Sequence, residues 1–212
     1  MVRAARVQHS RGVFLNVPFD RGYRHLFNAL VFTIHQCGFI ARCALEMDDG
    51  SQVRLDKLYT IIAQCRYGVH DLSRVTLDSV RRLPRFNMPL ELGIFLGAKR
   101  FGGSRQRSKR ALILERDQWR YQAYCSDIAG QDIRAHNNEV GAAIRVVRNW
   151  LHTQRDGSLP MPGHRFVGDR FVVFEKELPT VCRAAKLDVR DLTFLERRTL
   201  VTDWLALDRR AA

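Results

Sequence analysis

Short apolar segments alternate with helical patterns along the first 155 residues of the chain. The apolar segments have the length of buried strands and span residues 12–19, 39–45, 67–71 and 111–115. Each is followed by a stretch whose apolar residues recur at helical spacing, at 24–37, 55–65, 88–100 and 140–151. Such alternation predicts a parallel sheet with helices on both faces. We therefore expect a Rossmann-like, flavodoxin-like α/β domain over residues 1–155.

Residues 156–212 follow a different pattern, which predicts a linker and a helical extension. The segment 156–169 contains two prolines and three glycines, as is typical of a linker. Amphipathic helical stretches follow at about 170–187 and 194–207. Pro179 is expected to break or kink the first of them, and Thr193 with Glu196 forms a capping-box pattern before the second. Because the apolar residues of these helices need a surface, the extension is expected to dock on the α/β domain or on a second subunit.

The chain is strongly basic: 35 Lys and Arg residues against 22 Asp and Glu residues give a formal net charge of +13. This excess indicates an anionic partner such as a nucleotide, a nucleic acid or an acidic protein, although GC-rich coding DNA also produces arginine-rich chains. A nucleic acid is the less favoured partner, because stacking aromatic residues are not interleaved with the basic ones. The densest basic cluster, predicted to be a flexible solvated loop or an anion contact, comprises Lys99, Arg100, Arg105, Arg107, Lys109 and Arg110.

Several classes of protein are disfavoured by what the sequence lacks. No apolar run is long enough to span a membrane, and residues 1–10 carry no signal peptide pattern. Five cysteines without a CxxC pair suit reduced thiols, so we expect a cytoplasmic protein. The motifs GxGxxG and GxxxxGK[ST] are missing, which argues against a dinucleotide oxidoreductase and a P-loop NTPase.

Polar residues gather where the predicted strands end. In parallel α/β sheets, ligands bind at the carboxyl ends of the strands, so we expect the loops after the first three strands to form a cleft. The candidate binding residues in and around these loops are Asn16, Phe19, Asp20, Arg21, His70, Ser73, Arg74 and Asn87. His70 has a second interpretation as a half-buried strand residue.

Glu91 lies in the first turn of the apolar helix that begins near Asn87. An acid at this position complements the helix dipole and can cap free N–H groups. The alternative is a carboxylate in a ligand cleft, which attacks or stabilises the sugar C1′ of a nucleoside as glycosidase carboxylates do. Burial raises the pKa of such a carboxyl and the helix dipole lowers it.

Three segments together resemble the nucleoside 2-deoxyribosyltransferase and TIR-like superfamily: Val13–Asp20, His70–Arg74 and Asn87–Lys99. The resemblance covers roughly residues 12–116. It implies that Glu91 is the catalytic glutamate, which cleaves N-glycosidic bonds of nucleosides or of NAD, and that Asp71, the strand-end aspartate of the site, is the second catalytic residue. The segment between Asp71 and Asn87 is longer and more basic than in the family, and residues 156–212 have no counterpart in it.

The resemblance implies an N-glycosidase that acts on NAD or a related nucleotide or nucleoside and needs no metal or prosthetic group. Asp71, Asn87 and Asn16 would bind ribose hydroxyls, and Arg74, Arg21 or the basic cluster would meet phosphates. We also expect a homo-oligomer, with a role in stress or phage defence implied by resemblance alone. The alternative is a module that binds a nucleotide signal without turning it over.

Asp132 and His136 are four residues apart, a spacing that can hold a metal ion on a helix. No third ligand is evident, so a helix cap or a surface pair is the favoured interpretation.

Overall fold

The computed structural model describes residues 11–75, 86–155 and 161–211. Its centre is a five-stranded sheet with the order β2-β1-β3-β4-β5, in which every pairing is parallel. The strands are β1 (Gly12–Asn16), β2 (Ile40–Arg42), β3 (Tyr67–Asp71), β4 (Arg110–Glu115) and β5 (Ile133–Ala135). The expected parallel α/β fold with flanking helices is therefore confirmed.

The strand order reverses between β1 and β3, which are neighbours in the middle of the sheet. Asn16 at the end of β1 is in register with His70 near the end of β3. Every residue of both strands is buried, as their apolar sequences predict for a sheet covered on both faces. The two carboxyl ends therefore meet at the switch point, where open α/β sheets bind ligands.

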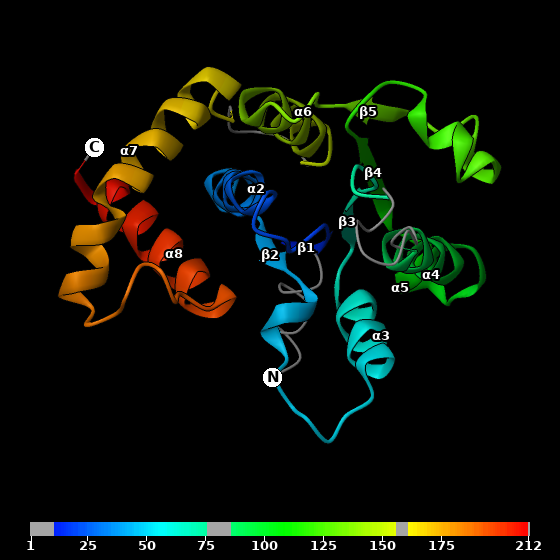
Figure 1. Ribbon diagram of the computed structural model, residues 1–212, viewed down its shortest axis with the longest axis horizontal. Helices are drawn as coiled ribbons and strands as arrows, with labels where there is room; N and C mark the ends of the chain where they lie inside the picture. Colours follow the sequence, from blue (N-terminus) through cyan, green and yellow to red (C-terminus); the bar gives the residue numbers. More distant parts are fainter. Residues whose placement is uncertain (1–10, 76–85, 156–160, 212) are drawn as a thin grey trace.

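Helices cover both faces of the sheet (Figure 1). One face carries α2 (Arg24–Gln36) and α6 (Val140–Thr153), whose apolar residues share a core with β1 and β3. The other carries α3 (Arg54–Gln64) and α4 (Asn87–Phe101), which pack around Phe14. The short elements are η1 (Ala44–Glu46), α5 (Ser104–Arg107), η2 (Arg120–Ala123) and η3 (Ser126–Ile128).

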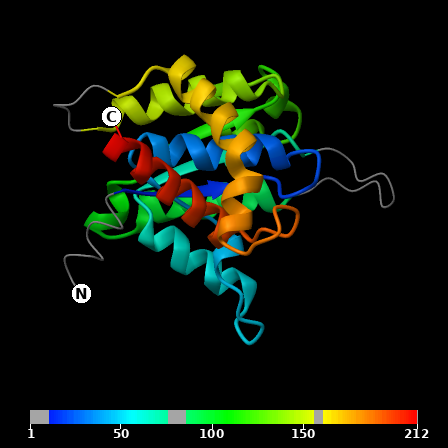
Figure 2. The same ribbon diagram turned by 90° about the vertical axis from the view of Figure 1, so that its left-hand side faces the viewer.

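The extension packs on the α/β layers through α7 (His164–Ala184) and α8 (Phe194–Ala211). Figure 2 shows both helices crossing in front of α2. Ala29 and Phe32, on the side of α2 away from the sheet, belong to one apolar cluster with Phe174 and Val201. Docking on the α/β domain, one of the two expected alternatives, is thus observed.

Two details of the extension differ from the sequence-based prediction, and a third confirms it. The helix α7 begins at His164, inside the segment predicted to be a linker, and residues 156–160 lie outside the described part. It runs through Pro179 without ending there, because the helix is held by the apolar cluster beneath it. The capping box of α8 is confirmed, since Glu196 Oε2 accepts from Thr193 N at 2.8 Å and Glu196 N donates to Thr193 Oγ1 at 3.2 Å.

The predicted basic loop is mostly helical. Lys99 and Arg100 form the last turn of α4, and α5 follows at once. Lys109 is fully buried rather than solvated: its ammonium donates to the carbonyls of Ile62 and Cys65 and lies 4.4 Å from the centroid of the Phe95 ring. The carbonyls at the end of α3 need donors, which explains why the cation is held inside.

The remaining corrections concern two strands. The second strand is shorter than the predicted 39–45, because η1 begins at Ala44. The strand β5 was not expected, and it is flanked by Asp132 and His136, so these two residues do not share a helix. In the described part of the chain, no helix has the length and apolar character needed to cross a membrane.

Candidate functional site

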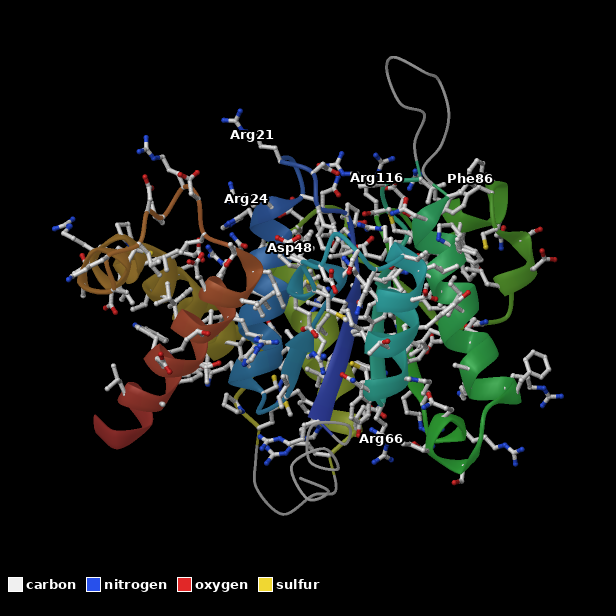
Figure 3. The ribbon with its side chains drawn as sticks, turned by 90° about the horizontal axis from the view of Figure 1, so that it is seen from below. Arg21, Arg24, Asp48, Arg66, Phe86 and Arg116 are labelled. Carbon is white, nitrogen blue, oxygen red and sulfur yellow. The ribbon has the colours of Figure 1, made fainter. Side chains whose placement is uncertain are left out.

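The first turn of α4 is tied to the carboxyl end of β1 by Asn16. Its side-chain Nδ2 donates to the carbonyl of Met88 at 2.8 Å and lies 3.1 Å from Nδ1 of His70. Asn16 is 2% exposed, so both amide contacts are shielded from water. Figure 3 shows this end of the molecule at its upper edge, where Arg21, Asp48, Arg116 and Phe86 are labelled. Asn16 therefore positions the helix that carries Glu91.

His70 is fully buried and lies between two aromatic rings. Its ring centroid is 4.8 Å from that of Phe95 and 5.9 Å from that of Phe14. A side chain at Gly68 would collide with it, because a Cβ there would lie 2.5 Å from His70 Nε2. Burial, with a smaller effect of the Lys109 charge, lowers the pKa of His70 to about 3. The ring is therefore neutral and packs in the core, where it orients Asn16.

Asp71 is fully buried, and its two oxygens contact three groups. Oδ1 accepts from Ser73 N at 2.8 Å, Oδ2 accepts from the Tyr23 hydroxyl, and Nε2 of His136 lies 2.9 Å from Oδ2. Burial alone would raise the pKa of Asp71, but the contacts with His136, Tyr23 and Ser73 lower it below its ordinary value. The carboxylate is thus ionised and joins β3, α2 and β5.

His136 is a site residue, and the interpretation of it as a helix cap or surface partner of Asp132 is wrong. It is fully buried, and its Nδ1 accepts from the backbone N–H of Asn138 at 3.1 Å, which leaves the ring proton on Nε2 facing Asp71. The backbone turns sharply just after it, since Asn137 and Asn138 both have positive φ angles of 53° and 58°. Two consecutive asparagines tolerate this conformation well. This pair of asparagines is the feature of the sequence that could have indicated a strand end at His136.

Glu91 is only 6% exposed and makes no hydrogen bond or ion pair with any described residue. Burial raises the pKa of its carboxyl to about 7, against the opposing charge of Arg54 at the start of α3. The two other buried carboxylates of the described residues are engaged: Asp71 as above, and Glu115 with Arg120 Nη1 at 2.6 Å and the Tyr124 hydroxyl. A buried acid without a partner costs stability, which is typical of functional sites.

The remaining predicted residues surround this end of the sheet at different depths. Asp20 Oδ1 accepts from Tyr23 N at 3.1 Å and lies 3.8 Å from Arg74 Nη2. Ser73 is buried, and its hydroxyl has no partner among the described residues. Asn87 is exposed as the first residue of α4.

The structure does not bring all the predicted residues to one place. Asn16, His70, Asp71, Ser73 and Glu91 lie at the ends of β1 and β3 and the start of α4. Phe19 and Arg21 instead line a cavity between α2 and the start of α8, on the opposite face of the sheet from α4 (Figure 1).

Within the described ranges, no group of three or more His, Cys, Asp or Glu side chains is arranged to hold a metal ion. Comparison of the chain with models of protein families, with curated proteins and with solved structures finds no match.

Proposed function

We propose that the protein is an N-glycosidase that cleaves NAD or a related nucleotide, with Glu91 as the catalytic carboxylate. The observation that carries the proposal is the state of Glu91: a buried carboxyl, with a pKa raised to about 7 and no partner among the described residues. It is the fifth residue of α4, one position beyond the first turn in which the sequence predicted it. A carboxylate in this environment is weakly solvated and can stabilise positive charge that develops on a sugar C1′.

The number of free carboxylates favours NAD over an ordinary nucleoside. The base of a nucleoside generally needs a proton to leave, which calls for a second acid beside the first. The nicotinamide ring of NAD is already a cation and leaves as a neutral molecule, so one carboxylate is sufficient. Of the buried carboxylates in the described part, Glu91 is the one without a partner.

The proposed step begins when the bond between C1′ and the nicotinamide nitrogen breaks and its electron pair goes to the ring nitrogen. An oxygen of Glu91 stabilises the resulting oxocarbenium centre or bonds to it. Water then adds to C1′ and releases a proton, which yields ADP-ribose. Asn16 and Asp71 act as positioning residues in this scheme, because their polar atoms already bind Met88, His136 and Tyr23.

Cations at this end of the sheet supply the charge that a dinucleotide requires. Arg54 lies close enough to Glu91 to lower its pKa, and Arg74 is about one-third exposed beside Asp20. We propose that these two side chains meet the pyrophosphate, since guanidinium groups bind phosphate oxygens in pairs.

The test is a product assay with three proteins: wild type, Glu91→Gln and Leu90→Gln. Leu90 is 58% exposed in the same helical turn, so its substitution by the same residue type controls for disturbance of α4. Each protein is incubated with NAD, NADP and a panel of nucleosides and nucleotides, and products are resolved by chromatography with mass detection. Wild type and Leu90→Gln are expected to release nicotinamide, and Glu91→Gln to be slower by at least about a hundredfold.

Equal turnover by Glu91→Gln and wild type would refute the role of Glu91. If the folded wild type releases no product but binds NAD, and Glu91→Gln binds it as well, the protein is a nucleotide sensor rather than an enzyme.

A further inference from the structure

A cavity of about 370 Å³ lies between α2 and the start of α8, next to the loop that follows β1. Its volume falls in the range of about 300–1,000 Å³ that is usual for small-molecule sites. None of the described residues that line it is acidic, whereas Arg21, Arg24 and Arg197 all contribute to its wall. The cavity is therefore positively charged.

Two of these arginines, Arg24 and Arg197, are close enough for the charge of one to act on the other. Arg197 is 9% exposed and pairs with Glu175, but its Nε has no hydrogen-bond partner in the described part of the chain. Burial lowers the pKa of Arg197, Glu175 opposes this effect, and the nearby charge of Arg24 lowers it further. An anion placed between Arg24 and Arg197 would relieve their repulsion and supply the missing acceptor.

The rest of the cavity is aromatic. Phe27 and Phe194 are buried with ring centroids 5.9 Å apart, and Phe19 meets Phe27 edge-on at 5.5 Å. Phe19 remains 39% exposed, so an aromatic ligand has a ring against which to pack.

Asn28 adds a polar group to this apolar part. It is 9% exposed, lines the cavity, and its amide makes no hydrogen bond with any described residue. An amide on the cavity wall can both donate to and accept from a ligand.

We propose that this cavity is a nucleotide-binding site, with the phosphate between Arg24 and Arg197 and the base against Phe19 and Asn28. It is a different site from that of Glu91, because α2 and α8 lie on one side of the sheet and α4 on the other (Figure 1). Figure 3 likewise places Arg21 and Arg24 on the α8 side and Phe86, before α4, on the other. Because the wall combines α2 with the extension, a bound nucleotide would fasten the extension to the α/β layers. The proposal does not depend on the glycosidase activity.

The test is isothermal titration calorimetry of the full chain with AMP, GMP, CMP and UMP, at about 0.15 M salt, where distant charges are largely screened. Three variants are compared: Arg24→Gln in the cavity, Arg145→Gln on the exposed surface of α6, and Glu91→Gln in α4. The first two remove the same charge, so their comparison separates a specific contact from net charge. Adenosine and ribose 5-phosphate serve as probes that carry only one half of the nucleotide.

At least one monophosphate is expected to bind wild type, Arg145→Gln and Glu91→Gln equally, and to bind Arg24→Gln at least about tenfold more weakly. Adenosine and ribose 5-phosphate are each expected to bind more weakly than the nucleotide. The proposal is overturned if no monophosphate binds wild type, if Arg24→Gln binds as wild type does, or if Glu91→Gln alone abolishes binding. Circular dichroism of each variant establishes that it is folded.

Discussion

Nε2 of His136 lies 2.9 Å from Oδ2 of Asp71, and neither side chain is exposed to solvent. The contact links the residue after β5 to the last residue of β3, across β4. With Tyr23 on the same carboxylate oxygen, it also holds the loop before α2. The candidate site is thus built around a buried ion that the rest of the fold keeps in place.

Replacement of His136 by alanine is expected to lower the free energy of unfolding by about 3–5 kcal/mol, because it leaves the buried Asp71 carboxylate without the N–H group of His136. Asp132→Ala is the control: that side chain is 76% exposed and pairs only with Arg134, so its loss should cost under about 1 kcal/mol. Urea denaturation measures both. Equal stability of the two variants would contradict the role assigned to the pair.

Stability is expected to depend on pH through Glu91. The pKa of this group is raised in the folded protein to about 7, so between pH 4.5 and 7 the folded state binds more protons than the unfolded state. Its contribution is therefore favourable at low pH and lost as pH rises to 7, by up to about 3 kcal/mol. Glu91→Gln should remove this dependence and be more stable than wild type at pH 8, as measured by urea titrations at a series of pH values. A variant less stable than wild type at pH 8 would exclude a strained, unpaired carboxylate.

Turnover should follow the ionisation of the same group. If Glu91 stabilises a cationic centre at C1′, only its ionised form is active, so kcat/KM for NAD should rise with pH and level off above about 7. Rates measured across this range with the nicotinamide assay give the profile. A rate that falls as Glu91 ionises would instead make it a proton donor.

His35 is expected to make the docking of α8 sensitive to acid. It is 9% exposed, its Nε2 accepts from Ala41 N, and its Nδ1 lies 3.3 Å from Thr202 Oγ1 in α8. Burial, and then the Arg198 charge, lower the pKa of His35 to about 4. The stability that the neutral ring provides is complete above pH 6.5 and is lost as pH falls toward 4, by up to about 3 kcal/mol. His35→Gln should be less sensitive than wild type over this range, a difference that thermal unfolding measured by circular dichroism resolves; equal sensitivity would rule out His35 as its source.

The extension is held by aromatic packing, so Phe174→Ala should destabilise the protein by about 3–5 kcal/mol. Phe174 is fully buried, with ring centroids 5.5 Å from both Phe32 and Trp204. Val172→Ala, at a 65% exposed position of the same helix, should change stability by less than about 0.5 kcal/mol. Tryptophan fluorescence during denaturation measures the stability of both variants, and Trp204 lies beside Phe174. Similar losses of stability in the two variants would argue against this packing.

Much of the fold can be predicted from the sequence because local patterns report burial. The predicted strand 67–71 coincides with β3, and the predicted helix 88–100 differs from α4 by one residue at each end. The strand β5 could not be predicted in this way, because its three residues, among them Arg134, are at most half-buried and show no apolar run. The helix α2 shows the same limit. The spacing of its apolar residues predicts the face that meets the sheet, but it does not predict that Phe32 is buried beneath the extension.

The features of the candidate site likewise fall into those that the local sequence predicts and those that depend on the tertiary structure. The sequence by itself determined the order of the first four strands and the helices that follow them, the place of Glu91 near the start of an apolar helix, and the capping box of α8, since each depends on residues within a few positions of one another. Only the tertiary structure decided that Asp71 meets His136, that Glu91 is left without a described partner, and that Arg24 and Arg197 line the same cavity. These relationships join residues far apart in the chain, and periodicity carries no information about which distant side chain fills the space beside a given residue.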